Sequence, residues 1–290
     1  MGTENFNDSV FPISGNVDTA REIGGRYSQQ YQGADPYPHI CIDNFLADDV
    51  LSNVLEDIAQ VNRGPDAVYV RPQERLKVAF NPEELPPRLR DLFRTFNARP
   101  FLGFLESMTG IKGLLPDPYF LGGGIHEVKN GGHLDIHADF NLHPVLRVER
   151  RVNVLIYLNK DWEPGFGGQL EIWDKGMTHA VKKFDPMYGR CVVFNTNADS
   201  YHGNPNPVNH PRQVSRRSIA LYYYTATWDE RKQDRTTKFR TRPGSKDRFD
   251  WSTERKELIR DLCPPILTRL ALRDLCPPML FRFAKRVAKR

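Results

Sequence analysis

The second half of the chain is a succession of short, strand-length segments, and this pattern limits the fold more than any other feature. From Tyr119 onward, runs of apolar and aromatic residues alternate with clusters of Gly, Pro, Asn and Asp, which are typical of turns. The expected strands are Tyr119–Leu121, Ile125–Val128, Arg151–Leu158, Gly168–Trp173, Ala180–Phe184, Arg190–Phe194 and Ser218–Thr225. So many short strands in one stretch predict an antiparallel sandwich or barrel.

Two helical patterns precede these strands. Apolar residues recur at three-to-four spacing in the first, at Leu51, Val54, Leu55, Ile58 and Val61. The second runs from about Pro87 to Met108, and Pro100 is expected to divide it into two helices. Helices followed by strands predict an α+β protein whose N-terminal helices support the strand-rich core.

Charge and composition divide the chain into three regions. Residues 1–36 are polar with little periodicity and are expected to form a flexible leader. Residues 37–228 contain the expected main domain. Residues 229–290 hold 18 Lys and Arg against nine Asp and Glu, so the positive charge of the chain belongs to this basic C-terminal extension. Residues 1–228 together carry a net charge of −4, and nucleic acid is therefore not expected as a partner.

The cysteines and the apolar segments bear on the cellular compartment. Cys41, Cys191, Cys263 and Cys276 are scattered without a CxxC pair, which favours free thiols in a reducing compartment. No apolar run is long enough for a transmembrane helix, and the first residues do not resemble a secretory signal. We therefore expect a cytoplasmic protein.

The residues with the clearest chemistry are two histidines and an aspartate. His137 and Asp139 form a His-x-Asp, and residues two apart on a strand project from the same face. His202, just after the apolar strand at 191–194, is the best third ligand, and two histidines with one carboxylate leave positions open on an iron ion. His133 and Asp135 form a second His-x-Asp, which we interpret as two solvated residues in a glycine turn.

An anion-binding pattern follows the distal histidine. Arg216 and Ser218 share one face of an expected strand, so a guanidinium and a hydroxyl can hold one end of a dicarboxylate. A basic pair before a strand is often only a solvated edge. The order His-x-Asp, distal His and Arg-x-Ser makes a purely structural role for all three motifs improbable.

These motifs resemble a known family. The stretch from about Pro38 to Trp228 resembles the prolyl 4-hydroxylase-like branch of the 2-oxoglutarate and iron(II) dioxygenases. The similarity lies in Gly131-Gly132 before the His-x-Asp, in Tyr157-Leu158-Asn159-Lys160-Asp161-Trp162, in Gly167-Gly168-Gln169-Leu170 and in the strand Arg216–Tyr224. The resemblance implies a double-stranded β-helix (jelly roll) in which residues 37–228 form the dioxygenase domain.

The resemblance also implies roles for individual residues. It makes His137, Asp139 and His202 the catalytic iron ligands. It makes Arg216 the partner of the distal carboxylate of 2-oxoglutarate, supported by Tyr157 and Ser218. Arg217 is the alternative to Arg216, because a shift of one residue in the strand would exchange their faces. Collagen-type members have lysine in place of this arginine, which places the chain nearer the hypoxia-type and bacterial branches.

The implied activity is hydroxylation of an unactivated C–H bond. Fe(II), 2-oxoglutarate and O2 would be required, succinate and CO2 would be released, and ascorbate could serve as reductant. Related halogenases lack the carboxylate ligand, so Asp139 favours hydroxylation. Proline, free or in a peptide, or a related small molecule is the expected substrate. The alternatives are a non-catalytic jelly-roll binding or sensor module and, with less support, a zinc hydrolase using His137 and His202.

The basic extension contains an internal repeat. Ile259-Arg260-Asp261-Leu262-Cys263-Pro264-Pro265 returns as Leu272-Arg273-Asp274-Leu275-Cys276-Pro277-Pro278, and the chain ends in an apolar and basic run. As a basic amphipathic helix, this end could lie on an anionic membrane or contact a protein partner. The alternative is a helical pair that packs on the main domain.

Overall fold

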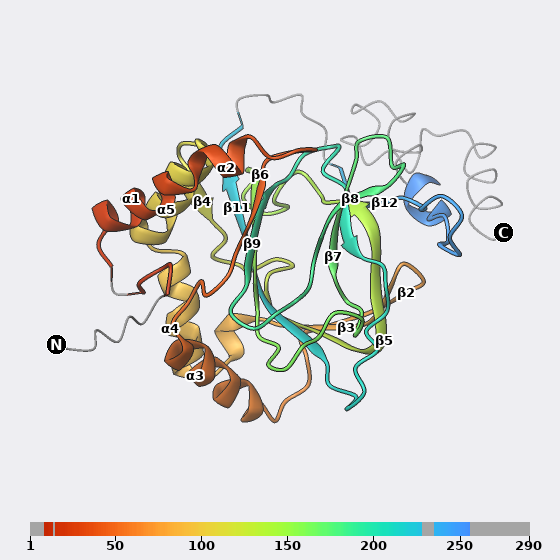
Figure 1. The fold of residues 1–290 in the computed structure, drawn as a ribbon, viewed down its shortest axis with the longest axis horizontal. Helices are drawn as coiled ribbons and strands as arrows, with labels where there is room; N and C mark the ends of the chain where they lie inside the picture. The colour runs from red at the N-terminus through yellow and green to blue at the C-terminus, as the bar shows by residue number, and fades with distance from the viewer. Residues whose placement is uncertain (1–8, 14, 228–234, 256–290) are drawn as a thin grey trace, which may run out of the picture. The chain divides into compact units, whose positions relative to one another are not determined.

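The computed structural model describes residues 9–13, 15–227 and 235–255 (Figure 1). The chain divides into two compact units, Met1–Phe249 and Asp250–Arg290. In the second unit only residues 250–255 are described, where the Asp250 carboxylate accepts hydrogen bonds from the Ser252 and Thr253 amides at the start of a helix. No helix in the described ranges is long and apolar enough to cross a membrane.

The helices of the first unit gather on one side of the sheet (Figure 1). They are α1 (Val17–Arg26), α2 (Ser28–Gln32), α3 (Asp48–Ala59), α4 (Pro87–Phe96) and α5 (Arg99–Thr109), with a 3-10 turn, η1, at Pro82–Glu84. Six fully buried phenylalanines form much of the core that they share with the sheet: Phe11, Phe45, Phe93, Phe96, Phe101 and Phe104. Pro100 lies in the first turn of α5, where its missing N–H costs nothing, so the expected division into two helices is confirmed.

The strands pair antiparallel throughout. The strands are β1 (His39–Ile42), β2 (Ala67–Arg71), β3 (Glu74–Phe80), β4 (Leu115–Pro116), β5 (Gly124–Ala138), β6 (Glu149–Tyr157), β7 (Leu170–Trp173), β8 (Ala180–Phe184), β9 (Cys191–Asn195), β10 (His202–Asn204), β11 (Arg216–Thr225) and β12 (Lys238–Phe239). Their main order is β1-β9-β6-β11-β5-β10-β7-β8, and β3 and β12 also pair with β5. The sheet curls into a nearly closed barrel, so the expected α+β fold with a jelly-roll core is confirmed.

Strand alternation separates the core from the barrel interior. On β6, Val152, Val154 and Ile156 face the helices, whereas Asn153 and Leu155 line a cavity inside the barrel. The same alternation on β11 sends Ile219, Leu221 and Tyr223 to the helical core and Arg216, Ser218 and Tyr222 to the cavity. A period of two therefore places polar residues inside the barrel without exposing the apolar face.

The N-terminal residues differ from the flexible leader expected for 1–36. Residues 17–32 contain α1 and α2, and Phe11 is fully buried against Phe101 and Phe104. The apolar residues are sparse there, because α1 approaches α5 through backbone rather than through large side chains. Gly24 is a point of close approach, because a Cβ there would overlap the backbone carbonyl of Phe104.

Three further segments differ from the sequence expectation. Tyr119–Leu121 is a turn rather than a strand, because the Asp117 carboxylate accepts hydrogen bonds from the amides of Tyr119 and Leu121. The β2–β3 hairpin was not expected at all. In the region expected as a C-terminal extension, β12 pairs with β5, while the repeat and the basic helical tail at 256–290 lie outside the described residues.

A matched pair of glycine substitutions tests the packing of α1 on α5. A Cβ at Gly24 would overlap the Phe104 carbonyl, whereas one at Gly25 meets nothing within 4 Å. We expect Gly24→Ala to lower the free energy of unfolding by about 1–3 kcal/mol through overpacking. Gly25→Ala should raise it by up to about 1 kcal/mol, because alanine favours a helix. Urea denaturation measures both, and equal effects would contradict this packing.

Candidate functional site

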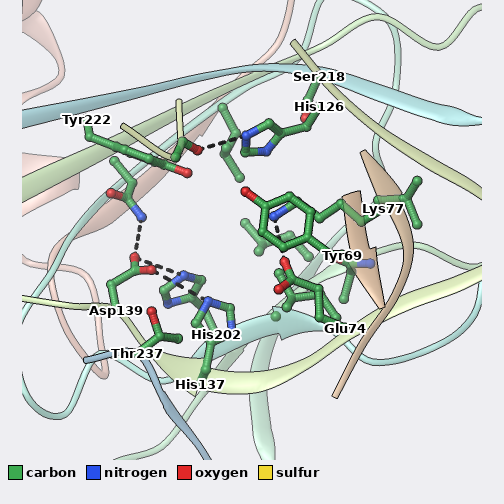
Figure 2. A pocket seen from close by; sticks show the side chains of 18 of the residues that line it. Tyr69, Glu74, Lys77, His126, His137, Asp139, His202, Ser218, Tyr222 and Thr237 are labelled. Carbon is green, nitrogen blue, oxygen red and sulfur yellow. Dashed lines mark hydrogen bonds and ion pairs between the residues drawn. The ribbon is translucent and has the colours of Figure 1, made fainter. Parts of the chain in front are cut away.

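A cavity of about 300 Å³ lies inside the barrel and is lined mainly by polar side chains (Figure 2). Strands β5 and β10 supply His137 and His202, and Asp139 follows directly after β5. Strand β11 supplies Arg216 and Ser218 to the same cavity. The candidate residues from distant parts of the sequence are therefore brought together in one place.

The two histidines and the aspartate form a compact cluster. His202 lies opposite His137 in the antiparallel register of β10 and β5. The Nε2 atom of His137 is 3.6 Å from Oδ1 of Asp139, and that of His202 is 3.4 Å from Oδ2. One possible ligand atom from each of the three residues lies within 4.8 Å of the others, and all three residues are buried.

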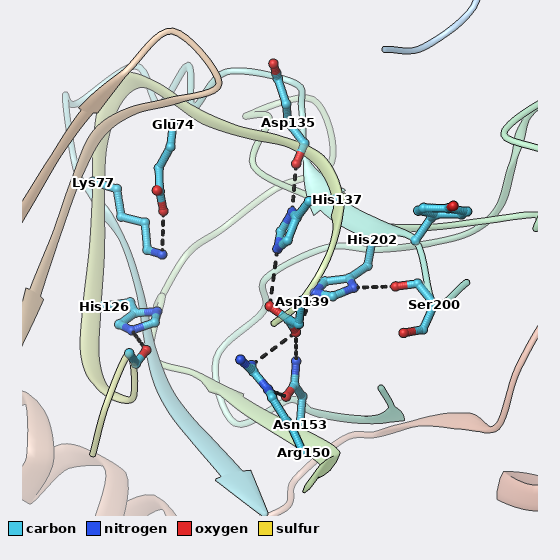
Figure 3. Close-up of polar contacts among 12 residues, drawn as sticks. Glu74, Lys77, His126, Asp135, His137, Asp139, Arg150, Asn153, Ser200 and His202 are labelled. Atoms are coloured by element: carbon cyan, nitrogen blue, oxygen red, sulfur yellow. Dashed lines mark hydrogen bonds and ion pairs between the residues drawn. The ribbon is translucent and has the colours of Figure 1, made fainter. Parts of the chain in front are cut away.

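Backbone carbonyls fix the orientation of both imidazoles (Figure 3). Nδ1 of His137 is 2.9 Å from the Asp135 carbonyl, and Nδ1 of His202 is 2.9 Å from that of Ser200. Because a carbonyl only accepts, each Nδ1 must carry the proton, which leaves the Nε2 lone pair free in the neutral ring. Burial lowers the pKa of His202, partly opposed by Asp139, and this keeps the imidazole in its neutral form.

A buried arginine and an asparagine hold the Asp139 carboxylate. Its Oδ2 atom accepts a 2.8 Å hydrogen bond from Asn153 Nδ2 and lies 3.1 Å from Arg150 Nη2. Arg150 also stacks over the Tyr222 ring at 3.6 Å. Burial would raise the pKa of Asp139, but Arg150 and the two histidines hold it well below its usual range. The carboxylate is therefore ionised.

This donor set fits a divalent metal ion. Two imidazoles and one ionised carboxylate could bind one face of such an ion, and this would leave its other positions open to other ligands. Metal-binding histidines and carboxylates are usually oriented by hydrogen bonds to their other polar atom, as both histidines are here at Nδ1. The residues of the cluster thus match the ligand set expected for iron(II).

Arg216 has a separate environment in the same cavity. Its Nε donates to the Gly168 carbonyl at 2.8 Å and its Nη2 to the Tyr157 hydroxyl at 3.2 Å. Within the described part of the chain, this buried cation has no carboxylate partner. Gly168 has a positive φ, and a Cβ there would lie 3.0 Å from Arg216 Cδ, so glycine leaves room for the guanidinium.

The remaining residues expected around Arg216 are arranged as follows. Ser218 lines the cavity, whereas Tyr157 is fully buried behind Arg216. Burial raises the pKa of Tyr157, partly opposed by Arg216, so its hydroxyl stays protonated. Arg217 points away from the cavity and pairs with Glu127 at 3.1 Å. The face of β11 therefore favours Arg216 over Arg217 as the anion-binding residue.

The second His-x-Asp lies away from this cluster. His133 and Asp135 are 3.5 Å apart, and neither lines the cavity. The interpretation as solvated residues was wrong for Asp135, which is buried. Burial, with a contribution from Asp247, raises the pKa of Asp135 to about 7. The backbone carbonyl of Asp135 accepts the hydrogen bond that orients His137, so this second His-x-Asp supports the metal-ligand cluster.

Sequence reasoning missed several polar residues of the cavity, and five of them bear on the chemistry of the site. They are Glu74, Lys77, His126, Arg150 and Asn153. Asn153 could have been found, because it interrupts an otherwise apolar strand on the face that Tyr157 shares. Arg150 is one of two adjacent arginines, and only the register shows which of them is buried.

Comparisons with known proteins show a shared fold and a family match over part of the chain. Two solved structures with TM-scores above 0.5 share the fold, and both are prolyl hydroxylases. The prolyl hydroxylase of Trichoplax adhaerens, in complex with a hypoxia inducible factor peptide fragment, is 16% identical (TM-score 0.52) over 73% of this chain and 94% of its own. The prolyl 4-hydroxylase of Phytophthora capsici is 17% identical (TM-score 0.51) over 73% of this chain and 66% of its own. No curated protein matches the chain significantly.

Residues 123–224 match the model of the 2OG-Fe(II) oxygenase superfamily. This match spans about a third of the chain, so residues 123–224 are similar to the 2-oxoglutarate and iron(II) oxygenases, and the chain shares the fold of the prolyl hydroxylases. The resemblance seen in the sequence is confirmed. The matched segment contains the cluster of His137, Asp139 and His202 as well as Arg216.

Asn153 provides a test of how the carboxylate is held. Asn153→Ala removes the hydrogen bond that Asp139 Oδ2 accepts from Asn153 Nδ2. We expect Fe(II) affinity to fall about 10–100-fold, as is usual when a partner of a metal ligand is lost. Anaerobic Fe(II) titration measures the change. Asn195→Ala is the control, since Asn195 lies on the neighbouring strand β9, accepts a hydrogen bond from the Tyr31 hydroxyl of α2 and does not line the cavity. Equal losses in both variants would contradict the role of Asn153.

Proposed function

We propose that this protein is an Fe(II)- and 2-oxoglutarate-dependent dioxygenase that hydroxylates an unactivated C–H bond and releases succinate and CO2. The observation that carries the proposal is the cluster of His137, Asp139 and His202 in the same cavity as Arg216, which has no carboxylate partner among the described residues. The substrate we infer is proline, in a peptide or free, or a related small molecule. The prolyl hydroxylase fold of the chain supports this choice.

In this proposal His137, Asp139 and His202 would hold Fe(II), which would supply the activation of O2 with 2-oxoglutarate as co-substrate. Each residue would contribute one ligand atom, and the hydrogen bonds at Nδ1 of the histidines leave both Nε2 atoms available as ligands. Arg150 keeps the Asp139 carboxylate ionised and balances its charge. The presence of a carboxylate ligand favours hydroxylation over halogenation.

Arg216 would bind the distal carboxylate of 2-oxoglutarate. A buried guanidinium with only neutral partners has unused N–H donors and an unbalanced charge, and a carboxylate satisfies both. The Ser218 hydroxyl faces the same space and can donate to the carboxylate. The Tyr157 hydroxyl accepts a hydrogen bond from Arg216 and so fixes the rotamer of this side chain.

The walls of the cavity limit the access of water. Leu155, Leu170, Phe194 and Phe239 place apolar surface beside the polar groups. In a low dielectric the attraction between Arg216 and a bound carboxylate is stronger than in water. Phe239 belongs to β12, which lies beyond residues 37–228, the range that we propose for the dioxygenase domain. A residue outside that range therefore also lines the cavity.

Three finer expectations remain predictions. They are ascorbate as a reductant, a cytoplasmic location, and a membrane or protein contact through the basic extension, most of which is outside the described residues. A protein or small-molecule substrate is the partner that we propose.

Alanine substitutions test the metal site. His137→Ala and His202→Ala should each abolish Fe(II) binding and 2-oxoglutarate turnover, because two ligands cannot hold the ion in place. Asp139→Ala should not hydroxylate even if some iron binds. Metal analysis of anaerobically purified protein and succinate formation are the measurements. His179→Ala is the control, because His179 is exposed and does not line the cavity. Normal turnover in either histidine variant would show that the ligands are misassigned.

The two adjacent arginines test the co-substrate site. Arg216→Ala leaves a buried carboxylate of 2-oxoglutarate unpaired, a loss of about 2–5 kcal/mol. The affinity for 2-oxoglutarate should therefore fall at least tenfold, as measured by calorimetric titration with Zn(II) in place of Fe(II). Arg217→Ala is the matched control and should have little effect, since Arg217 pairs with Glu127 outside the cavity. A larger effect for Arg217→Ala would reverse the assignment.

A further inference from the structure

The β2–β3 hairpin brings an ion pair into the cavity wall. Nζ of Lys77 lies 2.9 Å from Oε1 of Glu74, and the two side chains are only 11% and 9% exposed. Both residues line the cavity that contains the metal-ligand cluster. Figures 2 and 3 show the pair to one side of His137, Asp139 and His202. Neither residue contacts these candidate ligands.

A break in the strand puts both charges on the inner face. Residues three apart on a regular strand face opposite sides. Here the register of β3 with β5 shifts between Arg75 and Lys77, and Leu76 adopts a positive φ of 53°. The bulge turns Lys77 inward beside Glu74 and leaves Leu76 at the surface, 46% exposed. Bulges that redirect a side chain are common next to active sites.

Stability is a weak explanation for this pair. The cost of desolvating two charges is of the same order as their attraction, so a buried ion pair adds little to the free energy of unfolding. Burial would lower the pKa of Lys77, but Glu74 and two tyrosines hold it above its ordinary value, so the amine remains a cation. One of its three N–H donors is used by Glu74, and Tyr69 lies 4.5 Å below the ammonium.

A neutral histidine completes this side of the cavity. Nε2 of His126 donates to the Gly122 carbonyl at 2.8 Å, so Nδ1 is an acceptor. Burial, with Lys77 and two arginines, holds the pKa of His126 well below its usual range. The wall therefore offers a fixed cation, a fixed anion and a neutral acceptor.

We propose that Lys77 and Glu74 bind the carboxylate and the ammonium of a free amino acid, so that the substrate is a small zwitterion rather than a residue within a peptide. This rests on the proposed function. The ammonium nitrogen and carboxylate carbon of an amino acid are about 2.5 Å apart, since both are bonded to the same carbon. A cation and an anion 2.9 Å apart match that separation, with opposite charges facing each other.

A peptide would fit this wall poorly. Its backbone amides are neutral, so they would desolvate Lys77 and Glu74 without returning a charge to either. The cavity of about 300 Å³ must also hold 2-oxoglutarate, which leaves room for a small second molecule. With its charged end at Lys77 and Glu74, an amino acid would direct its side chain toward the metal-ligand cluster.

Binding to the wild-type protein tests the substrate class. The probes are the twenty common L-amino acids, each free and as its N-acetyl amide, together with a capped proline-containing peptide. Calorimetry with Zn(II) and saturating 2-oxoglutarate measures binding without turnover. We expect at least one free amino acid to bind at least tenfold more tightly than its capped form. Equal or tighter binding of the capped forms, or binding of none of the free amino acids, would overturn the proposal.

A double variant tests the two residues. Glu74→Gln combined with Lys77→Met removes both charges together and avoids leaving one buried charge unpaired. The affinity for the free amino acid should fall at least tenfold, while 2-oxoglutarate binding stays within twofold. Lys129→Met is the control, because Lys129 is exposed and follows the strand partner of Lys77. Unchanged amino-acid binding in a folded double variant would overturn the assignment. Failure of the wild type to bind 2-oxoglutarate would instead refute the proposed function itself.

Discussion

The antiparallel pairing of β10 with β5 sets His202 opposite His137, and the candidate metal site depends on this register. The two histidines are far apart in the sequence, so only the sheet brings them together. A slip of one residue would turn His202 to the other face of the sheet. Gly203 follows it, where any Cβ would lie 2.7 Å from the Asp135 carbonyl. Glycine therefore permits the approach of the two strands at the point where the ligand atoms must meet.

The charges inside the barrel account for much of its chemistry. Asp139 is balanced by Arg150, and Glu74 is balanced by Lys77. Arg216 alone among these buried groups has only neutral partners in the described chain. Because unbalanced buried charge is costly, Arg216 is the place where an anion adds the most stability. The other two pairs are already neutral and are better suited to orienting groups than to attracting net charge.

The sequence was sufficient to predict which side chains lie on the same face of a strand, because they alternate with a period of two. A His-x-Asp on one strand face, and Arg216 with Ser218 on another, follow from alternation alone, and the structure places these residues in one cavity. An antiparallel sandwich or barrel also followed from the many short strands, whereas its jelly-roll form was implied by the family resemblance. The branch of the family came from motif resemblance rather than from any physical rule.

The sequence was insufficient where tertiary contacts determine the conformation of a segment. Lys77 faces inward only because a bulge at Leu76 interrupts the alternation of β3. No pattern in the neighbouring sequence predicts this bulge. The segment before residue 36 was expected to be flexible because its apolar residues are few, yet Gly24 lets a helix pack closely against α5. The apolar segment Tyr119–Leu121 forms a turn because the Asp117 carboxylate accepts hydrogen bonds from two of its backbone amides.

The visible absorption spectrum of the anaerobic protein tests the central claim most directly. When a 2-oxo acid chelates Fe(II) through its carboxylate and keto oxygens, charge transfer from the metal to the ligand gives a visible band. Addition of 2-oxoglutarate to the Fe(II)-loaded protein should produce this band with one equivalent of each. His202→Ala should not show it. A wild-type protein that binds 2-oxoglutarate without developing the band would contradict a metal site formed by His137, Asp139 and His202.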